Sequence, residues 1–371
     1  MKIKGKILKN ITRKLTTVAR NRDYSIGANF VLKVFEESKI ATFFIFNNGD
    51  SYTFEVGLDE DSGEDINIVL DSKDIDYIAR KMKDDEDVIL ELDKNKDKLH
   101  VHQGNKKAEL QYMKPDGYYP EEANFHTNNE FSIYKDLGKI YDAVNFASQD
   151  EAKPHLCGVH INNKKIEATD GHFLYCAKTA EENNLHEDTF IVPAKVIDNI
   201  EKIMGKSDWM GLINENNNRA CIAIDSAGIL TKINFKFINS KFPPTDQVIP
   251  KYEKSFNIEK DKLFQAVDYV GKKEREQDTC GIKITCKQGK IKVEKINDGF
   301  QGVALEQYIN VDEMPESVDF SIALSRDILE PSLRVMKNKF ELKYKENEQN
   351  TKSALMLEDE EKQIVIMPLN V

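Results

Sequence analysis

This chain contains an internal repeat. Residues 69–82 (VLDSKDIDYIARKM) align without a gap on residues 191–204 (IVPAKVIDNIEKIM), so that Lys73 matches Lys195. Residues 324–336 form a looser third copy, which needs one extra residue and contains a proline. Each copy begins with a short apolar run and continues with apolar residues at helical spacing. The sequence therefore predicts the same strand–helix segment three times.

A second repeated segment sets the period of the repeat. Residues 140–147 (IYDAVNFA) match residues 263–270 (LFQAVDYV), and residues 14–21 (KLTTVARN) are a weaker relative. Matching positions lie roughly 125 residues apart, which is an ordinary size for one domain. A chain of 371 residues then holds three copies. The predicted domains are residues 1–127, 128–252 and 253–371.

The segments between these helices predict antiparallel strands. Residues 41–56 form a predicted hairpin around Asn-Gly-Asp, and residues 281–296 alternate apolar and polar side chains around Lys-Gln-Gly. Residues 158–179 contain two further turns, at NNKK and at TDG. Each repeat thus combines two helices with several antiparallel strands, and the predicted fold class is α+β.

The distribution of charge is uneven along the chain. The net charge is −11, which by itself argues against binding to nucleic acid. The six predicted helical segments and their short flanks, however, hold 26 Lys and Arg against 12 Asp and Glu, whereas the remainder holds 27 against 52. Helices often carry basic residues on a solvated face. The alternative is that the helices share one surface that faces a polyanion.

Other features of the composition exclude several classes of protein. The five cysteines include no CxxC pair, which argues against structural zinc and a disulfide framework and favours a cytoplasmic location. No apolar run approaches the ~18 residues of a membrane helix, and the basic amino terminus lacks the apolar core of a signal peptide. No P-loop, GxSxG, HExxH or dinucleotide-binding pattern occurs, so we expect no catalytic activity and no cofactor.

Two short motifs nevertheless contain residues that could do chemistry. The stretch ATDGHFLYCA (residues 168–177) places Asp170, Gly171 and His172 together, which suggests either a catalytic or metal-binding pair or a tight turn. We favour the turn, because glycine tolerates positive φ and aspartate bonds the local backbone. His100 and His102 share one face of a predicted strand, where a solvated pair is favoured over a metal site.

Four segments, in order, resemble the bacterial β sliding clamp, the processivity subunit of DNA polymerase III. The segment at residues 168–177 resembles ATDGHRLA of that family, and residues 191–203 resemble IVPRKGVIELMRM. Residues 241–250 (KFPPTDQVIP) resemble FPDYRRVLP, and residues 364–371 (IVIMPLNV) resemble the terminal YVVMPMRL. The length and the triplication agree as well. Residues 1–127 match least.

The resemblance implies three tandem DNA-clamp domains, with helices lining a ring and antiparallel sheets outside. It further implies a homodimeric ring that encircles duplex DNA without sequence preference and tethers the replicative DNA polymerase. The implied partners are DNA polymerase, the clamp loader and repair proteins with clamp-binding motifs, and no membrane is involved. Two alternatives stay open: a non-ring scaffold of the same domains, and a metal-dependent hydrolase that uses Asp170 and His172.

The resemblance also assigns residues to three surfaces. The peptide-binding cleft would comprise Leu156, Thr169, Gly171, His172, Phe173, Leu174, Pro243, Gln247, Val248, Arg326, Val365, Ile366, Met367, Pro368 and Leu369. Together with the charge pattern, it predicts DNA contacts from Arg13, Lys14, Arg20, Arg22, Arg80, Lys81, Lys195, Lys202, Arg334 and Lys337. The dimer contact would join Leu110 to Tyr269 and Val270.

The sequence departs from the family at the cleft. Phe173 and Gln247 stand where the family usually has arginine, and Asn370-Val371 replaces a terminal Arg-Leu. We therefore expect a more apolar cleft. The departures hint at a divergent member of the family, for which a phage or plasmid origin is one alternative.

Overall fold

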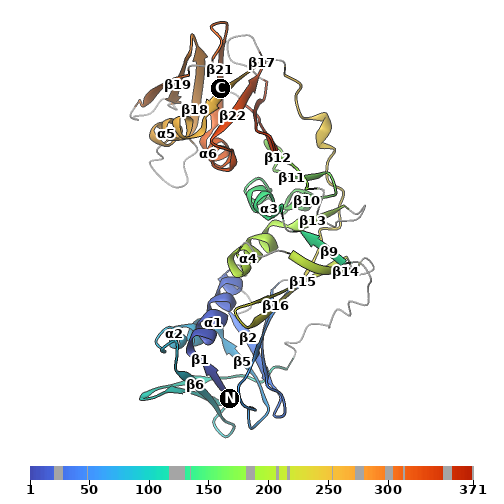
Figure 1. Ribbon diagram of the computed structural model, residues 1–371, viewed down its shortest axis with the longest axis vertical. Helices are drawn as coiled ribbons and strands as arrows, with labels where there is room; N and C mark the ends of the chain where they lie inside the picture. Colours follow the sequence, from blue (N-terminus) through green and yellow to red (C-terminus); the bar gives the residue numbers. More distant parts are fainter. Residues whose placement is uncertain are drawn as a thin grey trace. The chain divides into compact units, whose positions relative to one another are not determined.

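The computed structural model describes residues 1–20, 28–47, 49–116, 130–133, 135–180, 189–205, 209–214, 218–252, 254–271, 280–296, 304–311, 314–345 and 353–369. The chain divides into two compact units (Figure 1). The first unit comprises Met1–Gly138, Glu181–Asp188 and Val192–Asn239. The second comprises Lys139–Ala180, Thr189–Ile191 and Ser240–Val371.

The first unit contains one four-stranded and one eight-stranded antiparallel sheet. The four-stranded sheet has the order β1-β6-β7-β8. The eight-stranded sheet has the order β5-β2-β3-β4-β16-β15-β14-β9. The strands of this unit are β1 (Lys2–Lys4), β2 (Asn29–Val34), β3 (Ile40–Asn47), β4 (Asp50–Gly57), β5 (Ile66–Asp71), β6 (Asp87–Asp93), β7 (Lys98–Gln103), β8 (Lys106–Gln111), β9 (Glu130–Ile133), β14 (Trp209–Asn214), β15 (Arg219–Ser226) and β16 (Ile229–Lys236).

The second unit repeats this arrangement. Its eight-stranded sheet has the order β13-β10-β11-β12-β24-β23-β22-β17, and its four-stranded sheet the order β20-β19-β18-β21. Its strands are β10 (Gly158–Ile161), β11 (Lys165–Thr169), β12 (Phe173–Lys178), β13 (Phe190–Pro193), β17 (Lys254–Glu259), β18 (Gly281–Lys287), β19 (Lys290–Lys295), β20 (Glu306–Asn310), β21 (Asp319–Ser325), β22 (Lys339–Tyr344), β23 (Leu355–Glu358) and β24 (Lys362–Ile366).

Two kinds of half-sheet alternate along the chain. One kind has the orders β5-β2-β3-β4, β13-β10-β11-β12 and β21-β18-β19-β20. The other has the orders β1-β6-β7-β8, β9-β14-β15-β16 and β17-β22-β23-β24. Each kind occurs three times, as three copies of one domain require. We keep the three predicted domains as a proposal. Residues 127, 128 and 253, at their boundaries, lie outside the described residues.

The helices lie where the sequence predicts them. They are α1 (Gly5–Arg20), α2 (Ser72–Ala79), α3 (Leu137–Val144), α4 (Ala194–Met204), α5 (Lys260–Val270) and α6 (Arg326–Val335). In the first unit α1 lies beside α2, and in the second α5 lies beside α6 (Figure 1). Among the described residues, no helix is both long and apolar enough to cross a membrane.

Helix α1 shows why these segments become helices. Its fully buried side chains, Leu8, Ile11, Leu15 and Val18, recur every three or four residues and form one apolar stripe. Burying each such side chain contributes about 1.5–3 kcal/mol. The helix starts at Gly5, where a Cβ atom would lie 2.0 Å from the Lys83 carbonyl oxygen. Only glycine fits that close approach, which fixes the end of the helix against the chain after α2.

Candidate functional site

The segment at Asp170 is a tight turn, as predicted. Asp170 Oδ1 accepts hydrogen bonds from the backbone N–H groups of His172 (2.7 Å) and Phe173 (3.1 Å). Gly171 has a φ of 98°, in the region that favours glycine. His172 Nδ1 lies 3.7 Å from Asp170 Oδ2, which is too long for a hydrogen bond, and the His172 side chain is 72% exposed. The geometry is that of a solvated turn and not of a catalytic pair.

Beside this turn lies a buried apolar cluster that joins β12, β23 and β24. Leu174 is the register partner of Val365, and Val365 is the register partner of Met356. All three side chains are buried. Ile249 and Tyr252, from the linker between β16 and β17, pack against the cluster. The cluster thus combines strands from two predicted domains with the linker between them.

The carboxyl-terminal tail borders the same cluster. The Met367 N–H donates to the His172 carbonyl at 2.9 Å, and the Leu369 N–H donates to the Ala323 carbonyl at 2.8 Å. Met367 is 48% exposed, and Val248 on the linker is 63% exposed. Exposed apolar side chains at the rim of a buried cluster are typical of a site that receives apolar anchors of a peptide. The cleft itself stays a prediction.

Not every residue assigned to the cleft faces this cluster. Phe173 and Ile366 are register partners of each other, and each is next in sequence to a cluster residue. Because successive side chains on a strand point to opposite faces, both point away from the cluster. The ring of Phe173 packs on Phe146 instead, with centroids 4.9 Å apart. Neither side chain therefore lies on the face of the sheet that carries this cluster.

Polar residues of the predicted cleft have their own local partners. The Thr169 hydroxyl accepts from the Gly171 N–H and donates to the Phe173 carbonyl, so it serves the turn. Arg326 Nη2 lies 2.8 Å from Glu330 and 3.4 Å from Asp268. The guanidinium expected at the cleft is therefore held by two carboxylates.

The remaining predicted members lie on the linker, on the tail and on a short 3-10 turn. Gln247 is exposed, Pro243 and Pro368 are half-buried, and Leu156 is buried at the end of the turn Pro154–Leu156.

Sequence reasoning missed Met356, Ile249 and Tyr252. The signal for Met356 was available, because the short apolar runs ALMLE and QIVIM flank the charged residues DEEK and pair as a hairpin. Tyr252 has no such signal. Its hydroxyl donates to the Ala354 carbonyl at 2.5 Å, which only the folded chain reveals.

A second candidate site is a basic groove on the first unit. The groove has a volume of about 690 Å³ and lies among α1, α2 and α4. Its lining residues are Lys9, Arg13, Thr16, Thr17, Asp76, Arg80 and Lys202. Three residues predicted to contact DNA, Arg13, Arg80 and Lys202, are thereby brought together from different helices.

Carboxylates on the helices reduce the positive charge of this groove. Arg80 pairs with Asp76 at 2.5 Å, and Lys202 pairs with Asp198 at 2.5 Å. Asp76 also accepts from the Thr12 hydroxyl at 3.1 Å. The groove stays net positive, since its lining holds four cations and one carboxylate. Such a surface attracts a polyanion without reading its sequence.

Among the residues that the structure describes, the others predicted to contact DNA do not line this groove. Lys14 turns inward: its Nζ lies 3.4 Å from the Thr231 hydroxyl, and burial lowers its pKa. Arg334 lies over the Phe264 ring at 5.1 Å. Lys81 and Lys337 are exposed, and Lys337 Nζ lies 2.9 Å from the Glu360 carboxylate. Lys195 is exposed at the start of α4. Arg22 and the side chain of Arg20 lie outside the described residues.

The residues predicted at the dimer contact differ in exposure. Leu110 is half-buried on β8, which is an edge of its sheet. Tyr269 is 56% exposed, but Val270 is fully buried in its own domain and offers no side chain to a partner. Tyr308, which the sequence did not point to, is exposed on the edge strand β20.

The histidine pair on β7 is surrounded by carboxylates. His100 lies 3.5 Å from Glu109, and His102 lies 3.5 Å from Glu91. Within the described ranges, no group of three His, Cys, Asp or Glu side chains could hold a metal ion. The two histidines therefore lie on a strand face beside carboxylates.

Comparison with known proteins identifies the class of this fold. No protein-family model matches the chain. The chain is similar to the beta sliding clamp of Staphylococcus epidermidis, with 27% identity over 157 residues. That match spans 41% of this chain and 41% of the relative, so it covers about two-fifths of the curated relative's length.

Solved structures match over the whole chain. The DNA polymerase III subunit beta of Pseudomonas aeruginosa has a TM-score of 0.80 and 17% identity, covering 100% of this chain and 99% of that one. The Helicobacter pylori beta clamp bound to a DNA ligase peptide has a TM-score of 0.82 and 15% identity, with 100% of both chains covered. The chain therefore has the sliding-clamp fold, and the predicted resemblance and α+β class are confirmed.

Proposed function

We propose that this protein is a DNA sliding clamp: a ring-shaped homodimer that encircles duplex DNA and tethers the replicative DNA polymerase. It acts in the cytoplasm without catalysing a reaction. Its further partners are a clamp loader and repair proteins that carry clamp-binding motifs. The proposal adds an assembly, a ligand and a set of partners to the fold.

The pattern of sheet junctions is the observation that carries this proposal. Within the chain, β4 pairs with β16 and β12 pairs with β24, and each pairing joins one kind of half-sheet to the other. In the described part of the chain, β8 and β20 are the matching edges left without such a partner. Pairing β20 of one copy with β8 of another repeats the same junction. An edge strand has backbone N–H and C=O groups that can pair with a strand of another chain. Two β8–β20 contacts between two copies would close a ring.

The side chains on the two edge strands favour a selective contact. β8 carries Lys106, Lys107 and Glu109, and β20 carries Glu306. Charges on an edge strand discourage unspecific pairing, so only a complementary edge pairs well. Leu110, Tyr269 and Tyr308 supply apolar surface at these two edges.

The first test is the oligomeric state by analytical ultracentrifugation. We expect a dimer that becomes monomeric when Leu110→Asp and Tyr269→Asp are combined, because desolvating a charge in an apolar contact is costly. Met210→Asp, a substitution at another exposed apolar side chain, serves as the matched control and should stay dimeric. A monomeric wild-type protein would support the non-ring scaffold instead.

The second test separates encirclement from surface binding. Loaded protein should remain on closed circular DNA and slide off linear DNA with free ends. Replacing Arg13 or Arg80 should reduce the slope of the salt dependence of direct DNA binding by up to about one unit for each phosphate that the side chain neutralises. Equal retention on circles and on linear DNA would argue against a ring.

We further propose that the cluster around Leu174, with the tail and the linker, binds linear motifs of partner proteins. Deletion of residues 367–371 should abolish binding of polymerase-derived peptides and leave the dimer intact. Because Gln247 and Asn370 stand where the family usually has arginine, affinity should depend weakly on acidic residues in the motif. Full binding by the truncated protein would place the cleft elsewhere.

A further inference from the structure

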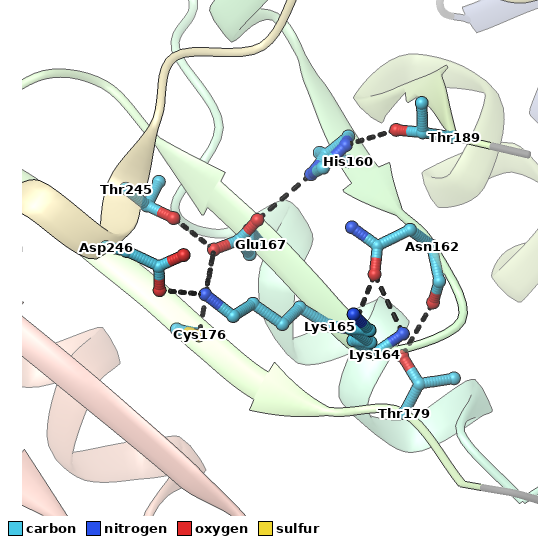
Figure 2. Close-up of polar contacts among 10 residues, drawn as sticks. All are labelled: His160, Asn162, Lys164, Lys165, Glu167, Cys176, Thr179, Thr189, Thr245 and Asp246. Atoms are coloured by element: carbon cyan, nitrogen blue, oxygen red, sulfur yellow. Dashed lines mark hydrogen bonds and ion pairs between the residues drawn. The ribbon is translucent and has the colours of Figure 1, made fainter. Parts of the chain in front are cut away.

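The linker ahead of β17 is fastened to the second unit by a polar network on β10, β11 and β12. The 3-10 turn Thr245–Gln247 supplies two of its side chains. The Thr245 hydroxyl donates to the carboxylate of Glu167, and Asp246 pairs with Lys165 (Figure 2). Glu167 lies 78 residues before Thr245, so the contact joins distant parts of the chain.

Glu167 is the centre of this network. Its side chain is 5% exposed, and Lys165 Nζ lies 3.8 Å from it. His160 Nδ1 lies 3.0 Å from the second carboxylate oxygen, and His160 Nε2 lies 2.5 Å from the Thr189 hydroxyl (Figure 2). The His160 ring in turn stacks on Phe242 of the linker, with centroids 4.7 Å apart and planes inclined by 9°. Glu167 thus touches the linker directly and supports it through His160.

The network keeps this buried carboxylate ionised. Burial alone would raise the pKa of Glu167, but hydrogen bonds from His160 and Thr245 and the charge of Lys165 hold it below the ordinary value of 4.5. The neighbouring Cys176 thiol shows the opposite effect, since burial and the Glu167 charge raise its pKa to about 12. A buried charge that is fully hydrogen-bonded fixes its neighbours in one arrangement.

The turn held by Glu167 leads directly into the wall of the cleft. The N–H groups of Val248 (2.9 Å) and Ile249 (3.3 Å) both donate to the Thr245 carbonyl. Val248 projects to the surface, whereas Ile249 packs against the cluster of Leu174, Met356 and Val365. A shift of Thr245 would therefore move the linker side of the cleft.

We propose that Glu167 is a positioning residue for the cleft, which acts through Thr245 and His160 to hold the linker wall against the Leu174 cluster. This inference rests on the proposed peptide-binding function of the cleft. It assigns a peptide-affinity role to a side chain on β11 that does not itself belong to the cluster.

The direct test follows the linker by hydrogen exchange at pH 7. We compare the wild type with Glu167→Gln and with Thr245→Val, which removes only the hydroxyl. The Val248 and Ile249 amides should exchange at least about tenfold faster in both variants, because their acceptor residue loses its anchor. The control is Glu294→Gln, at a half-buried strand glutamate that pairs with Lys292 and lies outside this network. It should leave the linker unchanged.

The functional test measures binding of a fluorescein-labelled peptide that carries the clamp-binding motif of a bacterial replicative polymerase. Each variant should weaken binding by about threefold to tenfold, as expected when one or two hydrogen bonds are removed. The double variant should bind no more weakly than the weaker-binding single variant, because both act through one contact. Additive effects would assign the two side chains separate roles.

The two proposals fail in different ways. If wild-type protein does not bind the peptide but the linker amides respond to Glu167→Gln, the cleft function fails and the fastening role of Glu167 stands. If peptide binds the wild type while linker exchange and affinity are unchanged in Thr245→Val and Glu167→Gln, the positioning role is wrong. If Thr245→Val unfolds at the same temperature as the wild type, general unfolding is excluded as the cause of faster exchange or weaker peptide binding.

Discussion

The two eight-stranded sheets use the same junction but satisfy their buried polar groups differently. In the first unit, Tyr52 on β4 lies opposite Ile233, and its hydroxyl accepts a hydrogen bond from Asn199 Nδ2 at 3.0 Å. In the second unit, Tyr175 on β12 lies opposite Ile364 in the same way. Its hydroxyl is buried and has no hydrogen-bond partner among the described residues.

The lysine beside each junction also comes from a different kind of element: a helix in the first unit and a strand in the second. In the first unit, Lys14 on helix α1 reaches the Thr231 hydroxyl on β16. In the second, Lys362 on β24 donates to Asp142 on helix α3 at 3.1 Å and to the Val335 carbonyl at 2.5 Å. The repeat therefore preserves the strand pairing and the apolar core, while each junction has its own polar contacts. The backbone contacts are shared because they do not depend on side-chain identity.

The largest effect is expected at Lys362. Lys362→Met keeps most of the side-chain volume but leaves the Val335 carbonyl and Asp142 without this donor. We expect a decrease of about 2–3 kcal/mol in the free energy of unfolding, with faster hydrogen exchange on β24. Denaturant unfolding measures the decrease. The control Lys287→Met removes an exposed ion pair and should change stability by less than about 0.5 kcal/mol.

Asn199 provides the next largest effect, in the other unit. Asn199→Ala leaves the Tyr52 hydroxyl buried without this donor, so we expect the free energy of unfolding to fall by about 1–2 kcal/mol. Exchange should accelerate on β4 and β16 and stay unchanged on β12 and β24. Adding Tyr52→Phe should recover part of the stability. If the double variant is less stable than Asn199→Ala, the hydrogen bond is not the reason.

The pH dependence of the two units should have opposite signs. Burial raises the pKa of Asp50 on β4 from 3.8 to about 7, so the folded first unit favours the protonated form. Its stability should fall as pH rises from about 4 to 7, by about 1 kcal/mol after allowance for partial exposure. Glu167 has a lowered pKa, so its contribution to the second unit is lost as pH falls below about 4.5.

Unfolding at a series of pH values, followed by exchange on β4 and β11, checks both signs. Asp50→Asn should remove the slope in the first unit and leave the second unit as it was. A slope that persists in Asp50→Asn would assign it to another group.

The smallest effect is expected at Tyr175. Tyr175→Phe removes a hydroxyl that has no partner among the described residues, so stability should change by no more than about 0.5 kcal/mol. Tyr52→Phe should cost more, since it leaves Asn199 Nδ2 without this acceptor. If denaturant unfolding shows the same loss of stability for both substitutions, the two junctions do not differ in how they satisfy the tyrosine hydroxyl.

Local sequence patterns were enough to predict the elements and their repetition. Helical spacing in residues 72–83 and 193–206 predicted α2 and α4, and alternation around Gly49 and Gly289 predicted two hairpins whose glycines have positive φ. The turn at Asp170 was also predictable. These features follow from local preferences of the backbone, which a few neighbouring residues set.

Only the folded chain shows which side chains meet. Leu174 faces the cluster and Phe173 does not, because the pairing of β12 with β24 sets which neighbours each face of the strand meets. Lys14 turns inward to Thr231, 217 residues away, although its charge suggested a DNA contact. Glu167 meets Thr245 in the same way. Such contacts depend on partners distant in the chain, so no local pattern contains them.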